Sequence, residues 1–224
     1  MSFTILAACT PNYAEILRYT LPSWFKNSGA DKILVERLEM AAGPRETAWY
    51  DNAAARCHAM TRNILAAFDR GERVLALDVD CVVLKSLESG FSPDHPISIA
   101  RWPNVNMGVM FWQPYFDFPY RGWLEAVADR VSRNCDIARG KLRKAGGCFL
   151  ADQSVWEDEL KKMEEHVHKL DEMVWNFCPL PETWIRDFLE HKDAIRIVHM
   201  KGQGQPRRHE IPKAMLAEHF PEKL

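Results

Sequence analysis

The chain has 224 residues, of which 47% are hydrophobic and 27% are charged, a balance typical of a globular protein with a substantial core. Its formal net charge of -2 gives no field that would attract nucleic acid or an anionic membrane surface, and no apolar run approaches the ~18 residues that span a bilayer. The six cysteines form no C-x-x-C pair, so neither a structural zinc site nor a disulfide framework is indicated. We therefore expect one cytoplasmic domain over residues 1–224, with no nucleic-acid partner and no transmembrane segment.

Strand and helix patterns alternate along the chain. The apolar run Phe3–Cys9 predicts an opening strand, and apolar residues at helical spacing predict a helix over Ala14–Asn27 that ends before Gly29. Later strands are expected at residues 32–38, 74–77, 97–100, 107–112 and 194–200, and later helices from Asp51 or Asn52 to about Phe68, at 121–133 and at 153–168. This alternation predicts an α/β fold in which helices flank a mostly parallel central sheet.

The stretch VLALDVDCVVL, residues 74–84, places two carboxylates directly after a buried apolar run. Asp78 and Asp80 stand at the carboxyl end of the expected strand, which is where α/β sheets bind their ligands. Side chains alternate along an extended segment, so both carboxylates flank Val79 on one side and repel each other unless a cation neutralises them. Hard oxygen ligands suit Mn²⁺ or Mg²⁺. The pattern therefore predicts a divalent metal site at Asp78 and Asp80.

An apolar strand followed by D-x-D fits two classes of enzyme. It resembles the first motif of the haloacid dehalogenase-type phosphatases, in which the first Asp, here Asp78, is the nucleophile and the second is an acid or base. It equally resembles the D-x-D of nucleotide-sugar glycosyltransferases. The phosphatase alternative lacks a later motif, because no G-D or D-D pair carrying a further Asp follows a later strand. A third alternative is a noncatalytic protein that binds a nucleotide sugar or a glycan.

Short blocks in a shared order resemble glycosyltransferase family eight, retaining enzymes of the GT-A fold. The blocks are TPNYA, TRNIL, LALDVDCVVLKSL, NMGVMFW, ADQSVW, VWNFCP and VHMKGQGQP, and they lie between residues 10 and 206. The resemblance implies a GT-A-like α/β fold and a metal-dependent transferase with retention of anomeric configuration. The implied donor is a nucleoside-diphosphate sugar, expected to be a UDP-sugar, and the implied acceptor is a glycan or another hydroxyl compound.

The resemblance also implies which residues hold the nucleotide. Asn12 and Tyr13 match the Asn-Tyr pair that lines the nucleobase pocket, and Thr10 stands where the family commonly has an Asp that reads the edge of uracil. Arg62, sixteen residues before Asp78, matches the basic residue that reaches the nucleotide phosphate. Structural roles fit the same residues, because Tyr13 suits an aromatic cover over the first helix and Arg62 suits a solvated helix face.

Three further residues match family positions at the donor sugar. Asn106 stands in N-M-G-V where the family shows N-A-G-V, and its implied role is a hydrogen bond to the donor sugar. Asp152 and Gln153 match an Asp-Gln pair near the reacting carbon and the donor and acceptor hydroxyls. Asp152 also suits a helix N-cap, and it is the candidate base if the product is inverted.

His199 follows the last expected strand, and a neutral imidazole is a suitable third ligand for Mn²⁺ beside two carboxylates. The family motif His-x-x-Gly-x-x-Lys-Pro places this His before a loop that clamps the diphosphate. Gly202 and Pro206 match that motif, but Gln205 stands at the Lys position. Lys201 and the arginines after Pro206 are the cations that are near enough to replace it, so we expect this tail to close over the diphosphate.

Overall fold

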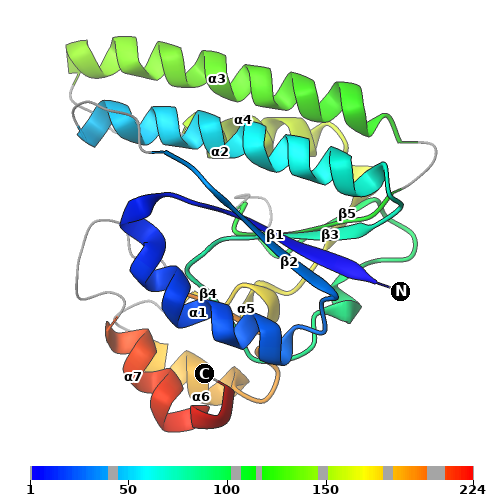
Figure 1. Cartoon of the computed structure of the whole chain (residues 1–224), viewed down its shortest axis with the longest axis vertical. Helices are drawn as coiled ribbons and strands as arrows, with labels where there is room; N and C mark the ends of the chain where they lie inside the picture. Colours follow the sequence, from blue (N-terminus) through cyan, green and yellow to red (C-terminus); the bar gives the residue numbers. More distant parts are fainter. Residues whose placement is uncertain are drawn as a thin grey trace.

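The computed structural model describes residues 2–39, 45–101, 107–114, 118–145, 151–178, 184–200 and 210–223. Within these residues a six-stranded sheet of order β2-β1-β3-β6-β5-β7 lies between two layers (Figure 1). All neighbouring pairs are parallel except the two that involve β6, so five strands share one direction. The strands are β1 (Phe3–Cys9), β2 (Lys32–Arg37), β3 (Arg73–Leu77), β5 (Ile97–Ile99), β6 (Val109–Trp112) and β7 (Val167–Lys169). The expected α/β fold with a mostly parallel sheet is confirmed.

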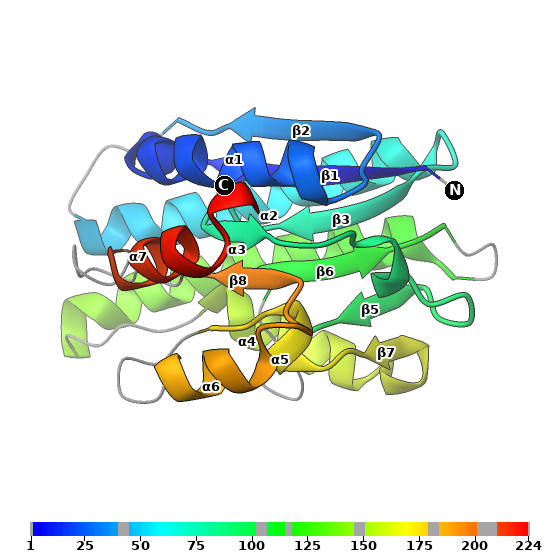
Figure 2. The same ribbon diagram turned by 90° about the horizontal axis from the view of Figure 1, so that it is seen from below.

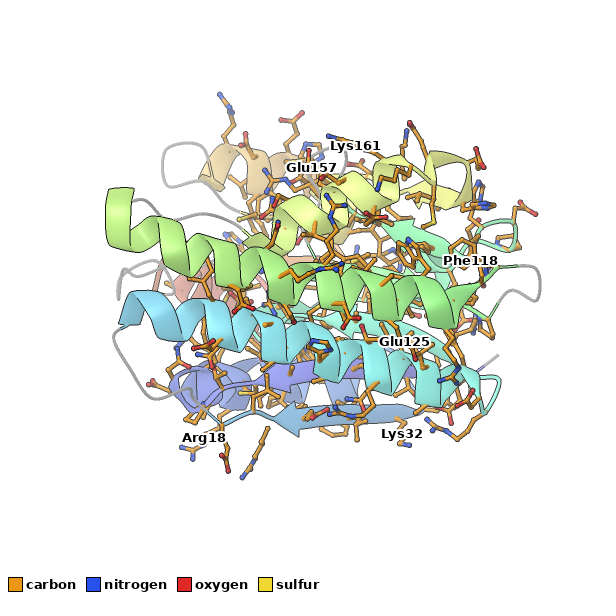
Figure 3. The ribbon with its side chains drawn as sticks, turned by 90° about the horizontal axis from the view of Figure 1, so that it is seen from above. Arg18, Lys32, Phe118, Glu125, Glu157 and Lys161 are labelled. Atoms are coloured by element: carbon orange, nitrogen blue, oxygen red, sulfur yellow. The ribbon has the colours of Figure 1, made fainter. Side chains whose placement is uncertain are left out.

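One face of the sheet is covered by three long helices, the three-helix layer, which lies above the sheet in Figure 1. It consists of α2 (Arg45–Phe68), α3 (Tyr120–Ala145) and α4 (Ala151–Lys161). Apolar residues such as Ile64, Val131 and Trp156 pack from these helices into one buried cluster with the sheet. Figure 3 views this layer from outside, where the exposed Glu125 and Lys161 lie. Within the described ranges, no helix has the length and apolarity needed to cross a membrane.

The opposite face carries the mixed layer, in which helices surround a small second sheet (Figures 1 and 2). The second sheet pairs β4 (Cys81–Val83) antiparallel with β8 (Ile197–His199). Buried side chains of both strands belong to one apolar cluster with Phe188 and Leu216, which come from two helices near the end of the chain. The helices of this layer are α1 (Ala14–Asn27), α5 (Glu172–Trp175), α6 (Trp184–His191) and α7 (Glu210–His219).

The first two elements have the bounds expected from the sequence, but α2 begins earlier than expected. Gly29 follows α1 with a φ of 76°, a left-handed conformation that glycine adopts without strain. The prediction that Asp51 or Asn52 caps α2 was wrong, because the helix starts at Arg45 and both residues lie inside it. Tyr50 is only 1% exposed and belongs to the core of the three-helix layer. Tertiary burial near the start of a helix can stabilise it without a strong capping signal.

The prediction of a helix over residues 153–168 was also wrong for the last part of this segment. α4 stops at Lys161, and Val167 and the two residues after it form β7 instead. Val167 is paired with Ile97 of β5 and is 5% exposed, so pairing at the edge of the sheet overrides the helical periodicity of this segment. The sequence did not predict β4, α6 or α7 as separate elements.

Candidate functional site

A tight turn joins β3 to β4 and carries the two acidic residues. The Asp78 N–H donates to the Gly108 carbonyl oxygen at 2.9 Å, and the Cys81 N–H donates to the Asp78 carbonyl oxygen at 3.1 Å. The chain therefore leaves the main sheet at Asp78 and enters the second sheet at Cys81. The Asp80 side chain is 12% exposed, whereas the Asp78 side chain is 28% exposed.

Two side chains of α1 donate hydrogen bonds to backbone carbonyls of this turn. The Thr20 hydroxyl donates to the Val79 carbonyl oxygen at 2.7 Å, and the Trp24 indole N–H donates to the Cys81 carbonyl oxygen at 2.7 Å. The Val79 side chain is buried, so its contribution here is through its carbonyl group. These bonds fix the direction in which the acidic side chains leave the turn.

Pairing between β4 and β8 brings a histidine from the far end of the chain to the turn. Cys81 and His199 are directly opposite each other in the antiparallel register. The His199 N–H donates to the Phe177 carbonyl oxygen at 2.8 Å, and the Met200 N–H donates to the Asp80 carbonyl oxygen at 2.8 Å. His199 is 2% exposed and is held on both sides by backbone.

The imidazole of His199 lies against both carboxylates. Its Nε2 atom is 3.2 Å from Asp80 Oδ1 and 3.7 Å from Asp78 Oδ2. Its other nitrogen, Nδ1, is 2.8 Å from the amide oxygen Oδ1 of the buried Asn176. Because an amide oxygen can only accept a hydrogen bond, this arrangement places the proton on Nδ1. A neutral ring in this orientation presents its Nε2 lone pair to two carboxylate oxygens, an arrangement that either a bound cation or a proton on Nε2 stabilises.

The donor atoms fit a divalent cation. Two ligand atoms bound at about 2.0–2.2 Å to one ion are roughly 3.0–3.4 Å apart, which is the separation of His199 Nε2 from Asp80 Oδ1. Donor atoms of Asp80, Cys81 and His199 all lie within 4.8 Å of one another. A metal-binding histidine commonly donates its other N–H to a fixed acceptor, as His199 does to Asn176. The structure thus brings Asp78, Asp80 and His199 together, and their binding of a metal stays a prediction.

Comparison with known proteins gives a fold but no family. No protein-family model matches the chain, and no curated protein matches it. Among solved structures, a glycosyltransferase involved in glycosylation of the major capsid of PBCV-1 has a TM-score of 0.61 and 18% identity, covering 96% of this chain and 100% of that one. Mouse xyloside xylosyltransferase 1 has a TM-score of 0.53 and 16% identity, covering 91% of this chain and 98% of that one. Galactosyltransferase LgtC, solved with donor and acceptor sugar analogs, has a TM-score of 0.52 and 17% identity, covering 99% of this chain and 95% of that one.

The chain has a GT-A-like fold. The phosphatase alternative is not favoured by these neighbours.

In this GT-A-like fold, the arginine beside the acidic pair is Arg56. Its Nη1 atom is 3.5 Å from Asp78 Oδ1. Arg62 instead pairs with Glu36 of β2 and has a side chain that is 64% exposed. Six residues of helix separate the two arginines by about 120° around the helix axis, so their side chains leave α2 in different directions. The phosphate-binding role expected for Arg62 stays a prediction, and Arg56 is the cation that sequence matching missed.

The residues expected at the nucleobase follow β1, the neighbour of β3 in the GT-A-like sheet. Parallel pairing of these strands places Thr10 and the acidic turn at the same edge of the sheet. The Thr10 hydroxyl donates to the Asn12 amide oxygen at 2.5 Å, and Tyr13 is half-buried against the cluster under α1. Their binding of a nucleobase stays a prediction.

The residues expected at the donor sugar are described only in part. Asp152 and Gln153 lie in the first turn of α4, and the structure describes the side chain of Gln153 alone, which is half-buried. Trp156, one turn further along, lines a cavity of about 20 Å³ together with Arg56 and Asp78, which places the start of α4 near the acidic turn. Asn106, Lys201 and Gly202 lie outside the described residues.

Two more residues of the site were absent from the predicted set. Asn176 lies in the block VWNFCP, so the resemblance pointed to its segment but assigned it no role. Cys81 directly follows Asp80, and its proximity to His199 depends on the β4–β8 pairing, which the sequence did not predict.

Proposed function

We propose that the chain is a metal-dependent glycosyltransferase, which transfers a sugar from a nucleoside-diphosphate sugar to a glycan or another hydroxyl acceptor. The observation that carries the proposal is the buried imidazole of His199, within 3.7 Å of both Asp78 and Asp80 at the carboxyl end of β3. The structural neighbours support it, because those described above are glycosyltransferases and one was solved with donor and acceptor sugar analogs.

The proposed cofactor is Mn²⁺ or Mg²⁺, held by Asp78, Asp80 and His199. When bound, the ion supplies positive charge beside the diphosphate, where negative charge grows as the sugar leaves. Asn176 positions His199 by accepting the hydrogen bond from Nδ1. Arg56, whose guanidinium lies 3.5 Å from Asp78, is a further cation that would bind a phosphate oxygen.

The other proposed roles come from the resemblance to glycosyltransferase family eight. Tyr13 stacks on the nucleobase beside Asn12, and Thr10 contacts the edge of the base. Asn106 binds the donor sugar, and Asp152 and Gln153 lie near the reacting carbon. Lys201 and Gly202 belong to the diphosphate clamp, and Arg62 is a further phosphate contact. The expected donor is a UDP-sugar and the expected stereochemistry is retention.

A thermal-shift panel tests the binding half of the proposal. Nucleoside diphosphates are added with Mn²⁺, with Mg²⁺ or with a chelator, and we expect at least one to raise the unfolding temperature only when metal is present. Absence of metal-dependent stabilisation by every nucleoside diphosphate would contradict the proposal.

Incubation with the matching nucleotide sugars tests the chemistry. We expect slow donor hydrolysis, and nuclear magnetic resonance of the product then reports whether the anomeric configuration is retained. Trapping a phosphate analogue on Asp78 would instead support the aspartyl-nucleophile phosphatase. Metal-dependent nucleotide binding with no turnover of any donor would support a noncatalytic nucleotide-sugar-binding protein.

A further inference from the structure

A buried thiol lies among the proposed metal ligands. Cys81 is 0% exposed and directly faces His199 across the β4–β8 pair. One donor atom of each of Asp80, Cys81 and His199 lies within 4.8 Å of the other two. The Cys81 Sγ atom is 3.8 Å from the Gly108 carbonyl oxygen, which fits a weak hydrogen bond from a protonated thiol. Mn²⁺ and Mg²⁺ prefer oxygen ligands, so the soft sulfur of Cys81 would not be needed to bind either ion.

The same donors satisfy the requirements of zinc. Zn²⁺ binds Cys sulfur, His nitrogen and carboxylate oxygen, usually as four ligands in a tetrahedron. Cys81, His199 and Asp80 supply one donor of each type. Asp78 Oδ2, 3.7 Å from His199 Nε2, is the nearest candidate for the fourth. The acidic turn and its paired strand therefore bring three zinc donors together, with Asp78 beside His199 as the candidate fourth.

We propose that this site has a second, inhibitory state in which Zn²⁺ is bound by Asp78, Asp80, Cys81 and His199. Zinc binding converts the Cys81 thiol to a thiolate, whose proton passes to solvent, and breaks the weak contact with the Gly108 carbonyl. Four protein ligands leave no position for a phosphate oxygen, in contrast to a Mn²⁺ site that keeps positions open. Zinc therefore excludes the nucleoside diphosphate. The inference rests on the metal site of the proposed function and not on sugar transfer itself.

Cobalt titration of the full chain, without nucleotide, tests the sulfur ligand directly. Co²⁺ replaces Zn²⁺ in such sites, and a bound thiolate gives a sulfur-to-cobalt charge-transfer band in the near ultraviolet. We expect the parent chain to show this band, Zn²⁺ to abolish it by displacement, and Cys81→Ser to lack it. Cys135→Ser is the matched control, because Cys135 is also 0% exposed but lies in α3, and it should keep the band. A parent without the band, or a Cys81→Ser chain with it, overturns the proposal.

Zinc affinity, measured by competition with a chromophoric chelator, gives a second readout. Loss of even an outer-shell partner typically costs about 10–100-fold in metal affinity, so Cys81→Ser should weaken Zn²⁺ binding at least about tenfold. Mn²⁺ binding should weaken less than Zn²⁺ binding does, because Mn²⁺ prefers oxygen to sulfur. Circular dichroism checks that the variant is folded, and Cys81→Ala replaces it if serine prevents folding. Equal losses for both metals overturn the proposal.

The inhibitory consequence is measured with a nucleoside diphosphate found in the thermal-shift panel. The zinc-loaded parent should bind it at least about tenfold more weakly than the manganese-loaded parent, a difference of about 1.4 kcal/mol. Equal binding overturns the exclusion of the nucleotide. The cobalt band needs no nucleotide, so its absence would count against the zinc state alone. Absence of metal-dependent nucleotide binding would count against the transferase proposal and the inhibitory role of zinc, and would leave the zinc ligand set to the cobalt result.

Discussion

The two layers that cover the sheet use their polar groups in different ways. In the three-helix layer, the buried Thr61 hydroxyl and Trp156 indole N–H have no hydrogen-bond partner among the residues that the structure describes. In the mixed layer, the equivalent groups of Thr20 and Trp24 both donate to backbone carbonyls of the acidic turn. At these four positions, the mixed layer bonds the backbone from which the site residues project, whereas the three-helix layer has buried polar groups with no hydrogen-bond partner among the described residues.

The difference between the layers indicates which contacts fix the positions of the site residues. Apolar packing tolerates changes that keep volume, because it has little directional preference. A buried hydrogen bond is directional, and removing its donor leaves the acceptor without a partner. We therefore expect substitutions that remove a hydrogen bond to the acidic turn to cost more stability than matched substitutions of the unpartnered groups in the three-helix layer.

The largest expected effect is on activity, from Asp80→Asn. The variant keeps the shape of the side chain but removes one of the two charges proposed to bind the metal, so donor turnover should fall roughly 100-fold or more. Loss of one charge from a pair of neighbouring carboxylates relieves repulsion, and the unfolding temperature without metal should change little. Turnover is measured with and without added Mn²⁺. Parent-like turnover in Asp80→Asn would rule out its role as a metal ligand.

The next effect compares two buried tryptophans. Trp24→Phe removes ring volume and the donor to the Cys81 carbonyl, so it should lower the free energy of unfolding by about 3 kcal/mol or more. Trp156→Phe removes similar volume but no hydrogen bond, and should cost about 1–3 kcal/mol less. Urea denaturation measures both. Equal losses would mean that the indole hydrogen bond of Trp24 adds no stability.

A smaller effect compares two buried threonines with no change in volume. Thr20→Val leaves the Val79 carbonyl without its donor and should cost roughly 1–2 kcal/mol of unfolding free energy. Thr61→Val replaces a hydroxyl that has no partner, so stability should stay the same or rise. Both are measured by urea denaturation without ligand. A larger loss for Thr61→Val than for Thr20→Val would reverse the contrast between the layers.

An ion pair on the outside of the three-helix layer should contribute less again. Arg130 Nη2 lies 2.7 Å from Asp158 Oδ2, and the two side chains are 35% and 56% exposed. Solvent screens such a pair, so its coupling energy should be below about 1 kcal/mol and should shrink in high salt. A double-mutant cycle of Arg130→Ala and Asp158→Ala gives that energy. A coupling that is larger than this and independent of salt would contradict the surface assignment.

The smallest effect is a pH dependence near β3. A hydrogen bond from Arg70, followed by one from Thr4, lowers the pKa of Glu72 from 4.5 to about 2. A lowered pKa contributes stability that is present above pH 4.5 and is lost as the pH falls toward 2. Glu72→Gln should therefore flatten the stability curve in that window, by a small amount because the carboxylate is partly exposed. Parallel curves for parent and variant would show no such contribution.

The strongest local patterns gave the most accurate predictions. β1 and α1 have the expected bounds, because a short apolar run and a helical stripe ended by glycine are decided within their own residues. The segment of β7 was wrongly expected to be helical, since its strand forms only beside β5. Sequence patterns describe one segment, and pairing depends on a partner that is far away in the chain.

For the candidate site, the sequence by itself determined the types of side chain: two carboxylates after a buried strand, and a histidine after the last one. Only the tertiary structure decided their neighbours. The β4–β8 pairing sets Cys81 opposite His199, and the rotation of α2 selects Arg56 over Arg62. The type of each side chain is a property of a single residue. The distances between side chains depend on how strands and helices from distant parts of the chain pack together.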